Sequence, residues 1–224
     1  MTNNKYSTVL TVLLIVVVIA ILVLLGFWAY DVYKKYDMQT GTQEALDEWE
    51  RTVKNQNTVV EEENITVDYS NVVNPFDSIK EIATTTTATT KTTYKGFVVV
   101  GRIAIPKTNL DLPVLEEVTK QSIEASCAIL YGPGLNKPGN TVIVGHNYRN
   151  GTLFSNNAKI AVGDKIYITD ETGNKVTYIV YNKYITTPED ADYMTRDTGG
   201  KMEISLSTCT DDSSGRIIIW AKAE

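Results

Sequence analysis

The sequence contains one histidine, two cysteines and no excess of basic residues. Lys and Arg number 21 against 27 Asp and Glu, which gives a formal net charge of −6 at pH 7. A chain without a basic stripe lacks the electrostatic footprint of nucleic-acid binding. One His and two separated Cys cannot supply the four ligands of a structural zinc site. These shortages exclude two common classes of function and leave few residues for nucleophilic or acid–base chemistry.

One long apolar run lies near the N-terminus, where residues 9–30 carry no charge. At 1.5 Å per residue, a helix of this length crosses a hydrocarbon core of roughly 30 Å. We expect a short head of residues 1–7 and a transmembrane anchor over residues 8–30, and the charges that flank the run do not decide its orientation. A cleaved signal peptide is the alternative, but the run is longer than the usual apolar region of such peptides and no Ala-x-Ala site follows it.

A stalk or linker is expected over residues 31–96. Apolar residues at three- and four-residue spacing in residues 42–53 predict a short helix, which we interpret as a solvated stalk segment. The Thr-rich residues 84–93 are low in complexity and predict an extended spacer. The Asn-Pro-Phe sequence at residues 74–76 is typical of an ordinary turn.

From residue 97 onwards the chain alternates short apolar runs with turn sequences, which predicts an all-β fold closed into a barrel. A single core is feasible for a segment of this size. One short helical insertion is expected at residues 119–125. The expected strands are residues 97–105, 112–115, 141–145, 165–169, 175–186, 202–208 and 216–222.

The last two of these strands predict a hairpin, because the turn-forming sequence Thr-Asp-Asp-Ser-Ser-Gly joins them. Cys209 and Arg216 then face each other across its mouth. A fixed guanidinium favours the thiolate over the thiol, whose unperturbed pKa is about 8.5, and it can also stabilise an oxyanion. We therefore expect a cysteine nucleophile beside a cation. An ion pair with the acidic turn is the alternative role for Arg216.

His146 follows the strand expected at residues 141–145. Strand ends often display catalytic side chains. Cysteine-dependent acyl transfer needs a thiolate, a proton donor and a stabiliser of tetrahedral charge, and Cys209, His146 and Arg216 can fill these roles. The alternative is that Cys209 is a structural thiol or forms a disulfide with Cys127, as extracellular proteins allow. Cys127 has apolar neighbours and is otherwise interpreted as a packing residue.

This set of residues resembles the sortase family, the membrane-anchored cysteine transpeptidases of Gram-positive bacterial surfaces. In sortases one strand ends in Gly-His, here Gly145-His146. A later strand ends in Leu-x-Thr-Cys, here residues 206–209, and an arginine opens the next strand, here Arg216. The resemblance covers residues 97–224, the expected catalytic domain, and implies a closed eight-stranded sortase-type β-barrel. The motifs are specific together, although each is weak alone.

The resemblance implies transpeptidation on surface proteins that carry a Leu-Pro-x-Thr-Gly-like sorting signal. Cys209 would attack the Thr carbonyl, Arg216 would stabilise the oxyanion, and His146 would protonate the departing glycine amine. An amine from a peptidoglycan precursor or a pilin would then resolve the thioester. This chemistry requires no metal or organic cofactor. The family also implies a single-pass membrane protein with residues 1–7 as a cytoplasmic head and an extracellular catalytic domain.

Substrate contacts are expected at Ser207, Thr208 and Tyr193, the last in a loop at residues 187–194 where sortases contact the sorting signal. Thr208 either orients the substrate backbone or simply favours the strand. We expect the chain to be closer to wall-anchoring or class D sortases than to pilin-polymerising class C, because no second apolar span follows residue 222. Two alternatives from other classes are a cysteine peptidase, in which water resolves the thioester, and a non-catalytic stalked binding module with a disulfide between Cys127 and Cys209.

Overall fold

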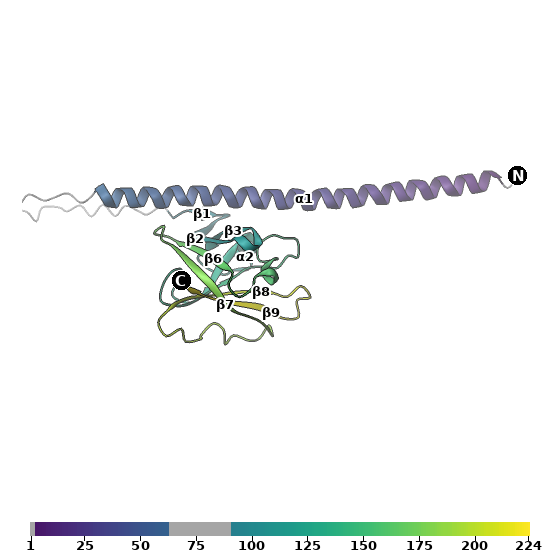
Figure 1. Cartoon of the computed structure of the whole chain (residues 1–224). Helices are drawn as coiled ribbons and strands as arrows, with labels where there is room; N and C mark the ends of the chain where they lie inside the picture. The colour runs from purple at the N-terminus through teal and green to yellow at the C-terminus, as the bar shows by residue number, and fades with distance from the viewer. Residues whose placement is uncertain (1–2, 63–90) are drawn as a thin grey trace, which may run out of the picture. The chain divides into compact units, whose positions relative to one another are not determined.

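The computed structural model describes residues 3–62 and 91–224 of the chain. The chain divides into two units, Met1–Gly41 and Thr42–Glu224. The turn predicted at residues 74–76 and most of the predicted Thr-rich spacer lie outside the described residues. Figure 1 shows one long helix, α1, and a barrel of short strands.

Helix α1 (Asn3–Glu62) includes both the predicted membrane segment and the short helix predicted after it. The elements that follow are β1 (Thr93–Tyr94), β2 (Phe97–Ile105), the 3-10 turn η2 (Pro106–Thr108), β3 (Leu110–Leu115), α2 (Lys120–Ala125), β4 (Cys127–Tyr131), β5 (Gly139–Val144), the 3-10 turn η3 (Asn157–Lys159), β6 (Lys165–Asp170), β7 (Lys175–Thr186), β8 (Met202–Cys209) and β9 (Arg216–Ala223).

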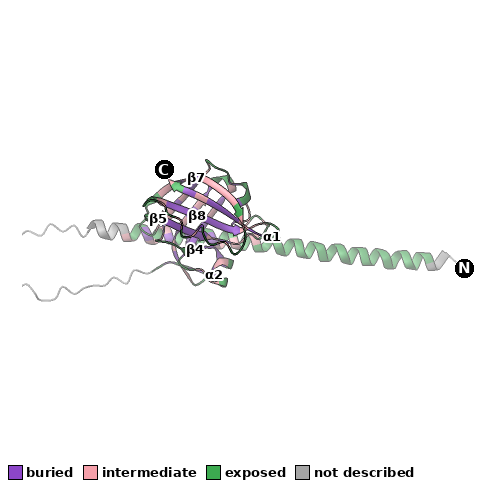
Figure 2. Cartoon of the chain, turned by 90° about the horizontal axis from the view of Figure 1, so that it is seen from below, coloured by how far each residue is buried: buried purple, intermediate pink, exposed green. Residues whose placement is uncertain are grey.

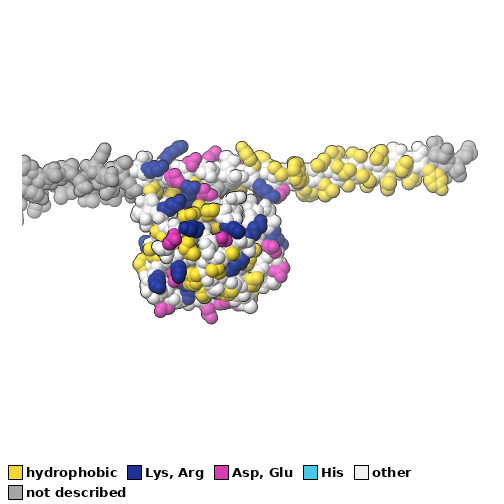
Figure 3. All heavy atoms as spheres, in the orientation of Figure 1, with side chains coloured by type: hydrophobic (Ala, Val, Ile, Leu, Met, Phe, Trp, Pro, Cys, Tyr) yellow, Lys and Arg dark blue, Asp and Glu magenta, His cyan; other side chains and the backbone are white. Residues whose placement is uncertain are grey.

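The first unit is the apolar part of α1. Its large apolar side chains are exposed, from Tyr6 at one end to Tyr36 at the other. Figure 3 shows yellow, hydrophobic side chains along most of this stretch, with white atoms between them. Among the described residues, one helical stretch, Tyr6–Gln56, is long and apolar enough to cross a membrane, by length and composition alone.

In the second unit, eight strands close into a barrel in the order β2-β3-β4-β5-β8-β9-β7-β6, and β6 pairs back onto β2. The two-residue strand β1 pairs with β2. Closure leaves no free edge within the eight strands. Alternate residues of β2 are buried, and fully buried isoleucines such as Ile103, Ile105 and Ile168 fill the interior. The predicted closed eight-stranded barrel is therefore confirmed.

Strand β4 was not among the strands expected from the sequence. It follows α2 after a single residue, Ser126, and pairs with β3 in parallel and with β5 in antiparallel orientation. The predicted helical insertion is the crossover that this parallel pairing requires. The side chain of Thr119 caps α2 by accepting a hydrogen bond from the Ser122 backbone N–H.

Strand β8 is buried on both faces. Its residues from Glu203 to Thr208 are all buried, whereas a barrel strand with one solvated face shows alternation. One face lies in the barrel core and the other is covered by the β7–β8 loop (residues 187–201), whose Tyr193 clusters with Val142 and Ile218. Figure 2 shows β5 and β8 mainly in the colour of buried residues.

The second part of α1 packs against the barrel. Trp49 and Val53 are buried in a cluster with Tyr94, Val99 and Leu115 of the barrel side. The interpretation of this helix as a solvated stalk is therefore wrong for its apolar face. Because the partners of that face lie about fifty residues further along the chain, the helical spacing predicted the stripe but not the surface that covers it.

Polar contacts lie at the edge of the same interface. Arg102 of β2 forms ion pairs with Glu50 of α1 and with Asp111 of β3. The Thr52 hydroxyl accepts a hydrogen bond of 3.0 Å from the Thr92 hydroxyl. This part of the helix thus belongs to the same folded unit as the barrel.

Replacing Trp49 by Ala should lower the free energy of unfolding by about 3–5 kcal/mol, because the substitution leaves a cavity between helix and barrel. At about 2–4 °C per kcal/mol, this is a fall of several degrees in the melting temperature of the full chain, measured by calorimetry in detergent. Glu48→Ala, on the exposed face of the same helix, is the control and should melt as the wild type does. Equal melting of Trp49→Ala and wild type would show that the helix does not support the barrel.

Candidate active site

The hairpin of β8 and β9 brings Cys209 and Arg216 together. The two residues are paired at the last position of the antiparallel ladder. The Nη1 of Arg216 donates a hydrogen bond of 3.1 Å to the Sγ of Cys209. A guanidinium held this close stabilises negative charge that develops on the sulfur or on an oxygen bound beside it.

The turn between the two strands is fixed by its own polar side chains. Hydrogen bonds from the side chains of Thr210 and Ser214 lower the pKa of Asp212 to about 2, so its carboxylate is ionised at neutral pH. Asp211 instead accepts a hydrogen bond from Asn147. Among the ion pairs of residues 3–62 and 91–224 none involves Arg216, so the ion-pair alternative for this residue is not observed.

His146 lies just beyond β5, which runs parallel to β8 with Val144 opposite Ser207. The Gly145 N–H donates to the Ser207 carbonyl at 3.3 Å, and the Thr208 hydroxyl donates to the Gly145 carbonyl at 2.7 Å. These bonds hold the backbone before His146 against the strand that ends in Cys209. A Cβ at Gly145 would meet the ring of Phe154 at 3.0 Å, so any larger residue at this position would have to displace that ring.

Asn147 was missed by the sequence reasoning and ties the residue after His146 to the hairpin. Its Nδ2 donates to the carbonyl of Cys209 at 3.0 Å and to Oδ1 of Asp211 at 2.8 Å. Nearby, Nη2 of Arg149 donates to the Ser213 hydroxyl at 2.6 Å. In the sequence, Asn147 is marked only by its position after His146. Its side-chain bond to Cys209, about sixty positions away, leaves no local pattern that could have predicted it.

The imidazole of His146 is half-buried and lies beside the ring of Tyr148, with ring centroids 5.1 Å apart. Bonds on both sides of this residue, through Gly145 and Asn147, reach residues 207 to 209 of β8. The structure therefore brings the three predicted catalytic residues to one end of the β5–β8–β9 part of the barrel.

The three predicted substrate contacts are buried. The Thr208 hydroxyl is bonded to the Gly145 carbonyl, and the Tyr193 hydroxyl donates to the Ser207 hydroxyl at 3.3 Å. These hydroxyls support the backbone beside the site. Direct contact of these residues with substrate stays a prediction.

Cys127 is a free, fully buried thiol on β4 that donates to the carbonyl of Pro113. Burial raises its pKa to about 12, so it remains a thiol at neutral pH. Cys209 is also free. The alternative of a disulfide between Cys127 and Cys209 is therefore wrong, because the two lie on different strands as separate thiols. No group of three His, Cys, Asp or Glu side chains suited to a metal ion occurs among the described residues.

The profile of the Sortase domain matches residues 103–224, which is more than half of the chain. The chain belongs to the sortase family. The match includes every strand from the middle of β2 to β9, together with His146, Cys209 and Arg216.

Two relatives of this sortase are similar in sequence. Sortase A of Bacillus anthracis is 36% identical over 124 residues, which cover 54% of this chain and 58% of that protein. Sortase A of Streptococcus agalactiae serotype III is 29% identical over 162 residues, covering 66% of this chain and 62% of that protein. The chain thus spans about six tenths of the length of these relatives.

Solved structures show the same barrel. A lid mutant of sortase A from Corynebacterium diphtheriae is 30% identical with a TM-score of 0.53, covering 57% of this chain and 71% of that one. A Clostridium perfringens sortase D5 transpeptidase is 27% identical with a TM-score of 0.52, covering 57% and 79%. A sortase C1 from Streptococcus agalactiae also has a TM-score of 0.52, with 25% identity and coverage of 56% and 69%. The similarity is therefore to the barrel that sortases of several types share.

The two thiols should differ in reactivity toward iodoacetamide. At pH 8 in the folded full chain, Cys209 should be alkylated and Cys127 should not, because burial both shields Cys127 and keeps it protonated. Intact-mass spectrometry should show one adduct on the folded protein and two after unfolding in guanidinium. The Cys209→Ser variant is the control and should show none while folded. An adduct on Cys127 in the folded protein would contradict the assignment.

Proposed function

We propose that this sortase is a membrane-anchored cysteine transpeptidase that cleaves a Leu-Pro-x-Thr-Gly-like sorting signal and transfers the surface protein to an amine. The observation that supports it most directly is the Arg216 N–H aimed at the sulfur of Cys209. The bonds that hold Gly145 and Asn147 on either side of His146 against β8 support it further.

In the first half-reaction, the Sγ of Cys209 attacks the carbonyl carbon of the signal threonine. The C–O electron pair moves onto the oxygen, where the guanidinium of Arg216 stabilises the charge. Collapse breaks the Thr–Gly bond, and His146 donates a proton to the leaving amine. A thioester on Cys209 and a free glycine-terminated peptide result.

In the second half-reaction, an amine attacks the thioester carbon and loses a proton to His146. The new amide forms as Cys209 leaves as a thiolate. The amine comes from a peptidoglycan precursor or a pilin, and the substrates are surface proteins. The exposed apolar part of α1 supports a single-pass membrane anchor. The placement of the catalytic domain outside the cell rests on membership of the sortase family.

The test uses the full chain in detergent with a panel of Leu-Pro-x-Thr-Gly-like peptides and an amine acceptor. Intact-mass spectrometry follows both protein and peptide. A thioester adduct on Cys209 and an acceptor-linked product would support transpeptidation. Hydrolysed product that acceptor does not change would indicate a peptidase instead. Absence of any adduct, although Cys209 is reactive toward iodoacetamide, would count against the proposal.

Substitution of the nucleophile and its cation should separate their roles. Cys209→Ala should abolish turnover, since no sulfur remains to carry the acyl group. Arg216→Ala should lower kcat by at least about 10²-fold, the scale of a lost oxyanion donor. Both are measured as acceptor-linked product over time, with Cys127→Ser as the matched control that keeps wild-type rates. Wild-type turnover in either active-site variant would refute the assignment.

Asn147→Leu should lower kcat/KM by about 10-fold or more, because small misplacements of catalytic groups are costly. The variant loses the bonds to the Cys209 carbonyl and to Asp211 but keeps every proposed catalytic residue. The control is Asn150→Leu in the same loop, whose side chain bonds only within that loop, to Thr152. If both variants behave like the wild type, Asn147 does not position the site.

A further inference from the structure

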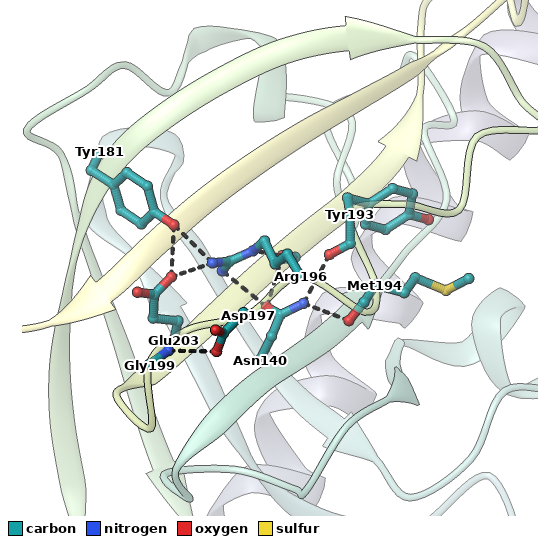
Figure 4. Close-up of polar contacts among 9 residues, drawn as sticks. Asn140, Tyr181, Tyr193, Met194, Arg196, Asp197, Gly199 and Glu203 are labelled. Carbon is teal, nitrogen blue, oxygen red and sulfur yellow. Dashed lines mark hydrogen bonds and ion pairs between the residues drawn. The ribbon is translucent and has the colours of Figure 1, made fainter.

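A network of buried polar side chains joins the β7–β8 loop to the barrel wall, away from the catalytic residues (Figure 4). At its centre Arg196 of the loop forms an ion pair with Glu203 of β8, and their side chains are only 11% and 9% exposed. The Tyr181 hydroxyl of β7 donates to Glu203 at 2.6 Å and accepts from Arg196 at 2.8 Å. Charges this far from water are retained only where partners surround them.

Asn140 of β5 makes the second connection to the loop. Its Nδ2 donates to the backbone carbonyls of Tyr193 and Met194 at 2.9 and 3.0 Å. Its Oδ1 accepts from Nη2 of Arg196 at 3.0 Å and from the Ser205 hydroxyl at 2.9 Å. One amide thus holds both the loop backbone and the loop's arginine.

The guanidinium of Arg196 also lies over the ring of Trp220 on β9, 4.7 Å from its centroid. Beside these contacts a pocket of about 410 Å³ lies between the loop and the β4–β5 turn, lined in part by Met194 and Thr195. On the side that faces this pocket the loop is held by polar bonds, whereas Tyr193 of the same loop packs against Val142 and Ile218. We name Arg196, Glu203, Asn140 and Tyr181 the loop clamp.

The loop begins at the catalytic end of the barrel. Thr186, the last residue of β7, is paired with Arg216, which is itself paired with Cys209. The Thr186 hydroxyl donates to Asp190 at 2.5 Å, which keeps the first loop residues at that end. Glu203 lies six positions before Cys209 on β8, a distance of roughly 20 Å along the strand. The loop therefore runs along the outer face of the barrel from the catalytic end to the clamp.

We propose that the loop clamp is a positioning device that sets the conformation of residues 187–195 and thereby the recognition of the sorting signal, without touching the reacting atoms. This inference rests on the proposed function. Without the bonds of Arg196 and Asn140, the loop keeps its connection at Thr186 and the packing of Tyr193, but polar bonds no longer fix its path over β5, β8 and β9. Binding of the signal then weakens, while Cys209, His146 and Arg216 keep their own contacts.

Three variants separate loop position from the effect of an unpaired buried charge. Arg196→Met removes the guanidinium and leaves Glu203 without its cation. Arg196→Met combined with Glu203→Gln removes both charges, so it should melt at a higher temperature than the single variant and still lack the clamp. Asn140→Leu removes the carbonyl bonds and changes no charge. The matched control is Lys201→Met, which removes an exposed cation at the last position of the same loop.

The first readout is amide hydrogen exchange of the full chain in detergent. The double variant and Asn140→Leu should speed exchange in residues 187–195 and leave the buried strands β5, β8 and β9 unchanged. The control should exchange like the wild type. Unchanged exchange in the loop, or faster exchange throughout the barrel, would overturn the proposal.

The second readout is the steady-state kinetics of signal cleavage. KM should rise by about 10-fold with kcat nearly unchanged. The variants lose contacts that hold the signal equally well in the ground state and in the transition state. The rate of Cys209 alkylation should stay at the wild-type value. Arg196→Lys should raise KM less than Arg196→Met does, because lysine keeps the positive charge but lacks the planar guanidinium that makes several hydrogen bonds at once. A fall in kcat alone, or an unchanged KM with a released loop, would overturn the proposal.

Failure of the two ideas can be distinguished. If none of the tested peptides forms an acyl adduct on Cys209 of the wild-type protein, the proposed function fails. Loop exchange still decides whether the clamp holds residues 187–195.

Discussion

Strand β8 lies between β5 and β9, and the backbone register of β8 with these neighbours fixes the relative positions of the candidate catalytic residues. The antiparallel register with β9 sets Cys209 opposite Arg216. The parallel register with β5 sets Val144 opposite Ser207, so two residues further along each strand reach His146 and Cys209. Because a slip of one residue would turn every side chain to the other face, the core residues of three strands hold this register.

Much of this arrangement could be predicted from the sequence because it depends on local signals. The turn between β8 and β9 is rich in Asp and Ser, and the structure has these side chains bonded within the turn. Strands β2, β6, β7, β8 and β9 begin at the residues where the apolar runs begin, since β-branched residues and flanking turns both favour those limits. The hairpin that presents Cys209 and Arg216 follows from these signals alone.

The rest depended on contacts between distant residues. Strand β4 follows α2 directly, so no turn sequence marks its start. A short apolar run without such a boundary is compatible with either a helix or a strand. The apolar stripe of α1 was visible, but its partner Tyr94 lies beyond a long intervening segment. Asn147, Asn140 and Arg196 look like ordinary polar loop or strand residues until folding brings their partners to them. A buried polar group needs hydrogen-bond partners, and these come from distant parts of the chain, so no local sequence pattern reveals them.

The burial of residues 203–208 of β8 on both faces means that the β7–β8 loop is also a wall of the hydrophobic core. Tyr193 from the loop covers Val142 and Ile218, and the barrel presents Asn140 and Glu203 to it as fixed polar partners. A loop transplanted from another sortase would have to bring an aromatic side chain and a cation at matching positions. Otherwise Val142 of β5 and Ile218 of β9 would become exposed to water, and Glu203 of β8 would lose its cation. The β7–β8 loop is therefore exchangeable only together with the strand residues that it covers.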